Sequence, residues 1–377
     1  MTFKRVTGTF LLLSISVLLT AAAQSWEGKT VILARPGVKL ETPEGKNIAP
    51  KTSGAAQDLT FEILKEDKDR VLIDSRRQQG WIAKSDAIPL DEAVAYFTRE
   101  LDRNPDNSHA LTARGLALMS GKDSDKYSDK AFADFDRAIA LDSKAILAYY
   151  HRANLAYGKT QYDKALADYN MVIALDPAFD WAYHVRGWIY YRRMDYDKAL
   201  ADYQKAIELA PTESVFYRDR GNIAVIRKEY DKALADYTRS IELEPTYSIP
   251  WQLRGRIWEF KKEYARALTD YEKAAELAGK ESFYSGHHIS LAMLLAACPD
   301  AKIRDGKKAL KAAQKAYELA KGPNELAALA AAHAELGEFD EAVAWQTRAV
   351  EAAPKALTEQ YQQRLKLYQE KKPYRRE

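Results

Sequence analysis

Cysteine is almost absent from this sequence: Cys298 is the single one among 377 residues. No disulfide can therefore form within the chain, whatever its redox compartment. Cys298 follows an apolar stretch, residues 291–297, which favours a small buried thiol. A disulfide to another molecule or a reactive thiol is the alternative.

The chain also lacks an excess of charge of either sign. Lysine and arginine number 57 against 54 aspartate and glutamate residues, so the formal net charge is only +3. Removal of residues 1–23, which hold two basic and no acidic residues, would bring it closer still to neutrality. A near-neutral chain gives no reason to expect a nucleic-acid partner.

Long apolar runs are missing as well. The longest, residues 10–19, follows Lys4 and Arg5 and precedes Ala21-Ala22-Ala23. A basic start, a short apolar core and small residues at the end predict a secretory signal peptide over residues 1–23. An uncleaved anchor is the alternative, but the run is shorter than the roughly 20 residues that cross a bilayer. We expect an exported protein, in the periplasm, on the cell surface or in the medium, with no membrane span after cleavage.

Sequence motifs of catalysis and metal binding are absent too. There is no glycine-rich phosphate loop, no Gly-x-Ser-x-Gly, no His-Glu-x-x-His and no paired-cysteine spacing. His287 and His288 are adjacent, so on a helix they would point about 100° apart and could not share one ion as an i, i+4 pair could. We expect no catalytic residue, no metal and no cofactor, and a protein that is not an enzyme.

What the sequence does contain is one unit of 34 residues repeated four times without a gap, over residues 146–279. The segment Tyr162–Tyr169 returns as Tyr196–Tyr203, as Tyr230–Tyr237 and, more loosely, as Tyr264–Tyr271. Each unit reads as two amphipathic helices whose apolar faces can be buried only against neighbouring units. The sequence therefore predicts a mainly α-helical solenoid of antiparallel helix pairs.

The period, together with a bulky residue at position 4, a small one at 8, Ala at 20, an aromatic at 24 and Pro at 32, resembles the tetratricopeptide repeat. The same phase extends beyond the four copies in both directions. The expected array covers residues 91–356, with a half repeat at 91–105, repeats at 108–145, 146–179, 180–213, 214–247 and 248–281, a degenerate repeat at 282–322 and a last repeat at 323–356. A polar turn over Gly121–Ser128 is expected in the first full repeat, and a capping helix with a basic tail at 357–377.

Residues 24–90 have a different pattern, with a period of two. Five short strands are predicted, at residues 30–33, 38–40, 59–64, 70–73 and 80–83. Five strands in so short a segment predict a small barrel, and the closing Gly80-Trp81-Ile82 is similar to the last strand of bacterial SH3-like (SH3b) domains. No Gly/Ser-rich linker follows, so we expect this domain to be docked on the helices.

Several segments towards the C-terminus also resemble exported tetratricopeptide repeat proteins of planctomycete-type bacteria. They include Cys298-Pro299-Asp300, Arg304-Asp305-Gly306-Lys307 and Lys372-Pro373-Tyr374-Arg375. That resemblance implies no activity.

Arginine at position 7 and aspartate at position 23 occur together in five repeats and vanish together in the degenerate ones. They predict a ladder of partly buried ion pairs between Arg114 and Asp134, Arg152 and Asp168, Arg186 and Asp202, Arg220 and Asp236, and Arg254 and Asp270. Anion binding by these arginines is the alternative.

The partner-binding residues follow from the resemblance, which implies that positions 2, 5, 9, 12 and 13 of each first helix line a concave groove. These positions give Tyr150, Asn154, Tyr157, Trp181, His184, Trp188, Tyr191, Arg192, Arg218, Asn222, Gln252, Arg256 and Phe260. Aromatic and arginine side chains are enriched where proteins are gripped. Packing between repeats is the alternative role for any one of these aromatics.

These observations favour a non-enzymatic scaffold or adaptor of the cell envelope, with a peptide or protein partner in the groove. The alternative is a cell-wall module, in which the SH3-like domain binds peptidoglycan and the repeats recruit an enzyme. A hydrolase without a known motif is a third, weaker hypothesis.

Overall fold

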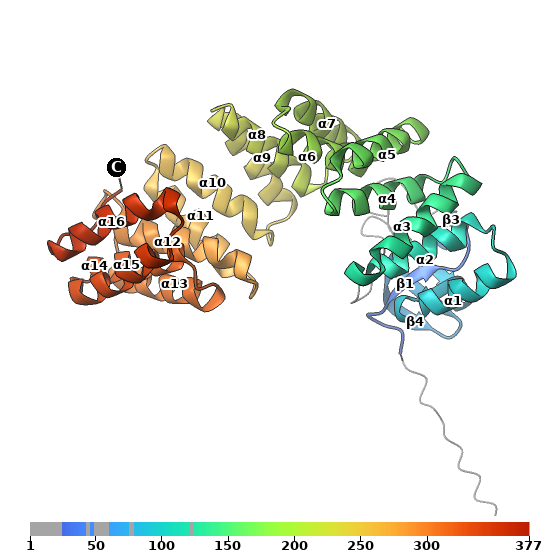
Figure 1. Cartoon of the computed structure of the whole chain (residues 1–377), viewed down its shortest axis with the longest axis horizontal. Coiled ribbons are helices and arrows are strands. Elements are labelled where there is room, and N and C mark those ends of the chain that lie inside the picture. Colours follow the sequence, from blue (N-terminus) through green and yellow to red (C-terminus); the bar gives the residue numbers. More distant parts are fainter. Residues whose placement is uncertain (1–24, 43–45, 49–59, 75–78, 121–123, 377) are drawn as a thin grey trace, which may run out of the picture. The chain divides into compact units, whose positions relative to one another are not determined.

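The computed structural model describes residues 25–42, 46–48, 60–74, 79–120 and 124–376 (Figure 1). The predicted signal peptide lies outside the described residues. The chain divides into two compact units, unit 1 up to Leu155 and unit 2 from Ala156 onwards. Each unit is described by itself below.

Unit 1 begins with an antiparallel sheet in the order β3-β2-β6-β5-β4-β1-β7. The strands are β1 Thr30–Leu33, β2 Leu40–Glu41, β3 Asn47–Ile48, β4 Thr60–Asp67, β5 Arg70–Asp74, β6 Gln79–Ala83 and β7 Ala87–Pro89, with a short 3₁₀ helix, η2, at Lys84–Asp86. Alternate side chains of these strands form one core, which includes Val31, Phe61, Ile73 and Ile82. The period-two pattern thus produces a sheet with a buried face.

The predicted closed barrel of five strands is wrong. Two further strands, β3 and β7, form the two edges, and no ladder joins these edges in the described part of the chain. β1 is buried on both faces, because Val31 and Leu33 face the sheet core while Ile32 faces helices. The sheet therefore covers its second apolar face with helices instead of closing on itself.

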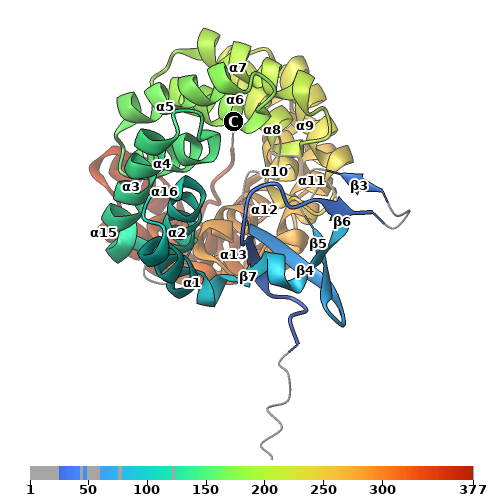
Figure 2. The same cartoon turned by 90° about the vertical axis from the view of Figure 1, so that its right-hand side faces the viewer.

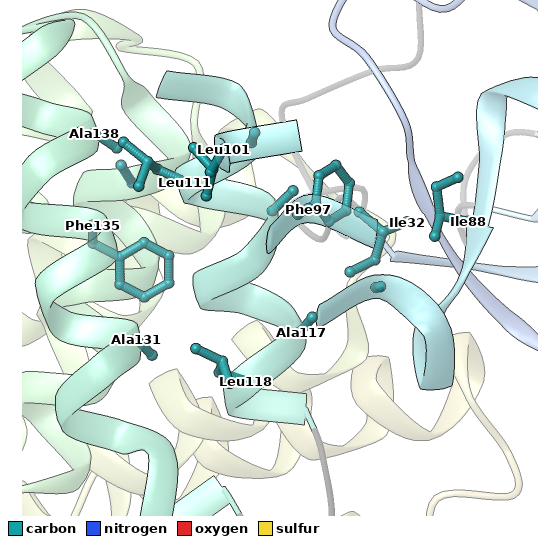
Figure 3. Packing of buried hydrophobic residues seen from close by; sticks show 14 residues of the cluster. Ile32, Ile88, Phe97, Leu101, Leu111, Ala117, Leu118, Ala131, Phe135 and Ala138 are labelled. Atoms are coloured by element: carbon teal, nitrogen blue, oxygen red, sulfur yellow. The ribbon is translucent and has the colours of Figure 1, made fainter. Parts of the chain in front are cut away.

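The helices that cover this face are α1 Leu90–Arg103 and α2 Ser108–Ser120. Ile32 and Ile88, paired across β1 and β7, belong to one apolar cluster with Phe97 of α1 and Leu111 of α2 (Figure 3). His109 adds a hydrogen-bond contact of 3.2 Å from Nε2 to the carbonyl oxygen of Leu33. The expectation that the sheet is docked on the helices is confirmed within unit 1.

Unit 1 continues with α3 Ser124–Leu141, and α4 Ile146–Gly158 contains the boundary between the units. The polar turn predicted over Gly121–Ser128 is wrong from Ser124 onwards, because α3 already begins there, and residues 121–123 lie outside the described residues. Asp125 lies in the first turn of α3, where an acidic side chain favours the helix N-terminus. Lys126 and Lys130 also lie over the ring of Tyr127, at 5.3 and 5.6 Å from its centroid.

Unit 2 is a succession of antiparallel helix pairs (Figure 1). Its helices are α5 Tyr162–Leu175, α6 Asp180–Arg192, α7 Tyr196–Leu209, α8 Ser214–Ile226, α9 Tyr230–Leu243, α10 Ser248–Phe260, α11 Tyr264–Leu277, α12 Ser285–Ala297, α13 Gly306–Leu319, α14 Pro323–Glu335, α15 Phe339–Ala352 and α16 Lys355–Gln369, with a 3₁₀ helix, η3, at Ser282–Tyr284.

The small residue at position 8 brings the two helices of a repeat together. A Cβ atom added to Gly221 would lie 2.8 Å from the ring of Tyr237, and Gly187 and Gly255 face Tyr203 and Tyr271 in the same way. These tyrosines are fully buried. The glycine is therefore needed for a close approach between helix and ring rather than for backbone flexibility.

The last part of unit 2 departs from the repeat pattern as expected: α12 and α13 are separated by an expanded turn that starts at Cys298. Cys298 is buried, and burial raises the pKa of its thiol, which makes it less reactive. α16 closes the stack, with Tyr361 and Tyr368 buried. Among the described residues no helix is both long and apolar enough to cross a membrane.

Candidate functional site

The first helices of the repeats share one side of unit 2. In Figure 2, α6, α8 and α10 lie on the inner side of the curve of this unit, and α7, α9 and α11 lie on the outer side. We give the name inner surface to the side chains that α6, α8, α10, α12 and α14 present at positions 9, 12 and 13, together with Tyr157, which stands at position 12 of α4 and lies in unit 2. Positions 12 and 13 are the last two residues of α6, α8 and α10.

An aromatic cluster forms the first part of the inner surface. The rings of Tyr157 and Trp188 meet edge to face with centroids 5.6 Å apart, and Tyr191 lies 6.3 Å from Trp188. The guanidinium group of Arg192, which is exposed, lies 5.2 Å from the centroid of the Trp188 ring. All three rings are only partly buried. The cluster thus offers flat apolar faces and a cation to a ligand.

A buried polar network lies beside this cluster, centred on Asp219 of α8. His184 Nε2 donates to Asp219 Oδ2 at 2.8 Å, and Arg218 Nε donates to Oδ1 at 2.7 Å. Burial by itself would raise the pKa of Asp219, but the hydrogen bonds from His184 and Arg218 hold it below its ordinary value. Asn222 completes the network, since its Nδ2 lies 3.4 Å from Asp219 Oδ1 and its Oδ1 accepts from Tyr237 at 2.7 Å.

This network changes the role of several predicted groove residues. His184 is buried, Arg218 is largely buried, and Trp181 packs edge to face on His184 at 5.1 Å. These side chains position the helices beneath the inner surface and are not free to meet a partner. The repeat register places these residues on the correct side of the helix. It does not show that His184 and Arg218 form buried hydrogen bonds with Asp219, at position 6 of its repeat.

The second part of the inner surface is a pocket of about 630 Å³ at α10 and α12. Its lining includes Arg256 and Phe260, both exposed, with Glu259, Tyr264 and Ser290. Phe260 is 64% exposed although its ring lies 4.7 Å from that of Tyr230. The predicted residue Gln252 is bound to the neighbouring repeat, because its Nε2 donates to Gly286 O at 2.8 Å and to Ser290 Oγ at 3.1 Å.

Glu259 is a residue that the sequence reasoning missed. It stands at position 12 of its repeat, the same place as Tyr157 and Tyr191, so the register alone could have found it. Tyr374 and Arg376, which also line the pocket, lie far outside the repeats, and no repeat pattern could have placed them there.

Two predicted groove residues lie in unit 1. Tyr150 is buried, with its ring 5.3 Å from that of His151, and Asn154 is partly buried. Tyr150 therefore serves the packing of α4, which was the alternative role for the aromatics.

The position-7 arginines pair with the position-23 aspartates in a repeated geometry. In each of four pairs, Nε and one terminal nitrogen of the arginine donate to the two carboxylate oxygens at 2.6 to 3.0 Å: Arg114–Asp134, Arg186–Asp202, Arg220–Asp236 and Arg254–Asp270. The hydrogen bonds to Asp236 raise the pKa of Arg220. Arg152 and Asp168 belong to different units; within unit 1, Arg152 contacts Asp136 at 2.6 Å.

The remaining nitrogen of each arginine reaches the preceding repeat. Arg186 Nη1 donates to Asn170 at 2.7 Å, Arg254 Nη1 to Thr238 at 3.1 Å, and Arg220 Nη1 to Gln204. The guanidinium groups of three of these arginines also lie over the position-4 ring of their own helix, at 5.0 to 5.6 Å from the ring centroid: Arg186 over Tyr183, Arg220 over Tyr217 and Arg254 over Trp251. With these contacts made, the arginines tie neighbouring repeats together and have little capacity left for an anion.

His287 and His288 are both buried in α12, and His287 Nε2 lies 3.0 Å from Ser248 Oγ. Burial, assisted by the neighbouring His288, lowers the pKa of His287 to about 4. In the described residues no three histidine, cysteine, aspartate or glutamate side chains are placed to hold a metal ion.

Comparison with known proteins gives two kinds of result. Family models of the tetratricopeptide repeat match residues 90–146, 181–213 and 326–355. No curated protein matches the sequence significantly.

Several solved structures are similar to the chain. Tom70 from yeast is 19% identical with a TM-score of 0.50, covering 74% of this chain and 58% of its own. The Cut9–Hcn1 hetero-tetramer of APC/C gives 15% identity and a TM-score of 0.52, covering 66% and 46%. YrrB, described as a tetratricopeptide repeat protein with an unusual peptide-binding site, is 22% identical with a TM-score of 0.40, covering 48% of this chain and 91% of its own.

The helix pairs, the small-residue contacts and the family-model matches agree that the chain is built from repeats of this type. Repeats of this type act as interaction scaffolds, because stacked repeats present an extended surface whose residues are not needed for stacking. The chain contains tetratricopeptide repeats in both of its units.

Proposed function

We propose that this protein is a non-enzymatic adaptor that binds an extended segment of a partner protein on the inner surface of unit 2. The observation that carries the proposal is the aromatic cluster of Tyr157, Trp188 and Tyr191 with the exposed Arg192. Rings and guanidinium groups give contact area at a low entropic cost, which is why such side chains dominate binding energy at interfaces.

The residues that hold the stack and the residues offered to a partner are separate sets. The stack depends on the ion pairs and on the buried rings of Tyr203, Tyr237 and Tyr271, whereas Arg192, Arg256 and Phe260 are exposed. Large exposed apolar groups beside cations mark interaction sites on soluble proteins. This separation supports binding as the role of the inner surface.

The proposal places the adaptor in the cell envelope, because residues 1–23 have the pattern of a signal peptide. Expression of the whole chain in a bacterial host, followed by N-terminal sequencing, tests this part. An N-terminus at Gln24 supports export, and a chain that keeps residues 1–23 contradicts it.

The binding experiment is an affinity capture with residues 24–377, read by mass spectrometry. The variant Trp188→Ala/Tyr191→Ala/Arg192→Ala should lose the captured partner while its helical content and melting temperature stay the same. Arg218 is left intact, because its removal would leave Asp219 buried without its main cation. The matched control, Lys205→Ala/Glu208→Ala, changes an exposed pair on α7 and should keep the partner. Equal capture by all three chains would contradict the proposal.

A further inference from the structure

The C-terminal tail, residues 372–376, turns back on unit 2. After α16, Lys371 adopts a left-handed conformation with φ of 56°, and the amides of Lys371 and Lys372 donate to Tyr368 O and Leu367 O at 2.9 and 2.8 Å. These hydrogen bonds close the helix end, and Pro373 cannot continue it. The tail then runs without helix or strand and ends beside α10 and α12 (Figure 1).

The tail contacts the first helices of three successive repeats. Tyr374 packs against the alanine-rich apolar clusters of α12 and α14, under the guanidinium group of Arg364 at 4.4 Å. Arg375 donates to Ala296 O at 3.0 Å and pairs with Glu335 of α14 at 2.6 Å. The amide of Arg376 donates to Ala297 O at 2.9 Å, and its side chain pairs with Glu259 of α10.

These contacts occupy binding groups of the inner surface. Glu259 and Glu335 stand at positions 12 and 13 of their repeats, the places held by Tyr191 and Arg192 in the aromatic cluster. Ala296 and Ala297 close α12, where unpaired carbonyl groups and the helix dipole favour a cation. Each side chain of the tail thus meets a complementary group. Tyr374 meets an apolar patch, Arg375 meets the end of α12 and the carboxylate of Glu335, and Arg376 meets the carboxylate of Glu259.

The site is also held in shape by partners other than the tail. Glu335 accepts from Arg304 at 3.0 Å, and Glu259 accepts from Tyr271 at 2.8 Å. Both carboxylates would therefore keep their orientation with the tail removed. Tyr374 and Arg376 line the pocket of about 630 Å³ together with Arg256 and Phe260, so the tail covers part of the same surface.

Release of the tail breaks two partly exposed ion pairs and unpacks the ring of Tyr374. The side chains of Arg375 and Arg376 are 33% and 30% exposed, so water reaches both guanidinium groups, and Glu335 and Glu259 keep their hydrogen bonds from Arg304 and Tyr271. A segment held by such contacts can exchange with another of the same pattern.

We propose that the tail is a tethered ligand. The surface between Glu259 and Glu335 recognises an extended protein segment with the pattern aromatic-Arg-Arg, and the chain's own residues 374–376 occupy it until such a segment displaces them. The inference rests on the proposed function and names the chemistry of the partner segment. The adaptor then has a masked state, in which residues 374–376 cover this part of the inner surface.

The test uses a fluorescently labelled peptide that copies residues 369–377 and the whole chain from residue 24. The opened variant Tyr374→Ala/Arg375→Ala/Arg376→Ala should bind the peptide in fluorescence anisotropy. The wild-type chain should bind at least about tenfold more weakly, because its own tail competes at the high effective concentration of a tethered segment. A peptide with the same three alanines, and an opened chain with Glu259→Gln and Glu335→Gln, should show no binding.

A tail that merely caps the stack gives a different result. The opened variant would then melt earlier and bind no peptide, which overturns the proposal, as would equal binding by the wild-type and opened chains. Should the triple variant fail to fold, Arg376→Ala alone removes the Glu259 contact and leaves Tyr374 packed; it should bind the peptide more tightly than the wild type does.

Light scattering should show a wild-type monomer at all concentrations. A dimer that disappears in the opened variant would mean that tails exchange between copies, and would overturn the intramolecular mask.

Two outcomes separate this inference from the wider proposal. Peptide binding that survives Trp188→Ala/Tyr191→Ala/Arg192→Ala, with partner capture also unchanged in that variant, would contradict the proposed function and leave the tail site standing. Conversely, an opened chain that binds no peptide, while partner capture still depends on the aromatic cluster, would overturn the tail site and leave the proposed function standing.

Discussion

At the scale of single residues, the ion pairs decide how neighbouring repeats are joined. Arg220 is about one-quarter exposed, whereas Asp236 is nearly buried at 9%. Removing the arginine leaves a buried carboxylate without its cation, which costs more than the net value of the pair itself. The ion pairs therefore contribute little net stability, but a repeat that stacks out of register would lose a pair and leave a buried charge unpaired.

We expect Arg220→Ala to lower the free energy of unfolding by roughly 2–3 kcal/mol, somewhat below the value for a fully buried pair, because water reaches the guanidinium group. Asp236→Ala should lower the free energy of unfolding by less, and the double variant should lose less stability than the two single variants lose together. Urea unfolding of the four chains gives the coupling energy. The exposed pair Lys273–Glu276 is the control and should couple by less than about 0.5 kcal/mol. Additive losses at Arg220 and Asp236 would contradict the prediction.

A second residue-scale prediction concerns pH. Burial and the neighbouring His288 lower the pKa of His287 to about 4, whereas the unfolded chain titrates near 6.5. Between these values the unfolded state binds more protons, so stability should rise with pH from about 4 to about 6.5 and stay level above. The full difference corresponds to about 3 kcal/mol.

The measurement is urea unfolding at several values of pH across this window. His287→Gln cannot titrate and should flatten the profile, although the lowered pKa values of His109 and His288 leave some slope. A profile that is as steep in the variant as in the wild type would exclude His287 as a main contributor.

At the scale of elements, the helices follow from the sequence more completely than the sheet does. Each first helix of the clean repeats starts at the first residue of its unit, as α6, α8 and α10 do at 180, 214 and 248. The local pattern sets these bounds, since every repeat buries the same face against the same kind of neighbour. The sheet depends on pairings between distant segments, and β7 has only three residues, too few for a periodicity to appear.

The docking of the sheet leads to an element-scale prediction. Ile32 is fully buried between β1 and the first helices of unit 1. Ile32→Ala should cost about 2–4 kcal/mol, the usual loss for a large apolar side chain in a packed core. Leu64→Ala, at a 40% exposed position of the neighbouring strand β4, should cost less than about 1 kcal/mol. Thermal or urea unfolding of both variants tests this, and a small loss at Ile32 would argue against docking.

The same docking bears on the peptidoglycan hypothesis, which remains a prediction. Residues 24–90 alone would expose Ile32 and Ile88, so this fragment is a poor choice for a pull-down. The whole mature chain is the appropriate reagent.

At the scale of the whole molecule, the groove residues show where sequence reasoning stops. The repeat register placed Trp188, Tyr191, Arg192, Arg256 and Phe260 on one side of unit 2, because a helix of known phase fixes the direction of every side chain. It could not show that Asp219 draws Arg218 and His184 inward, nor that Arg376 returns to Glu259 across 117 residues. Those contacts arise from the stacking of repeats and from the reversal after α16.

Stacking also determines how unit 2 should unfold. In a linear array each repeat contacts only its neighbours, so a local loss of stability should spread only a short distance. Tyr368 of the capping helix is fully buried against Ala330 and Ala334 of α14 and Ala342 of α15. Replacing it with alanine leaves a cavity that costs about 3–5 kcal/mol by analogy with phenylalanine, and the cost falls on the last repeats.

We therefore expect Tyr368→Ala to increase amide hydrogen exchange strongly in α14, α15 and α16, and to leave exchange in α6 and α7 within about twofold of the wild type. Mass spectrometry of exchanged and digested samples resolves these helices. Tyr203→Ala is the reciprocal control, since this ring is buried between α6 and α7 and should expose those helices while the cap stays protected. Uniform loss of protection in either variant would mean that unit 2 unfolds as one cooperative body, in which case release of the tail at one end could be transmitted to the aromatic cluster at the other.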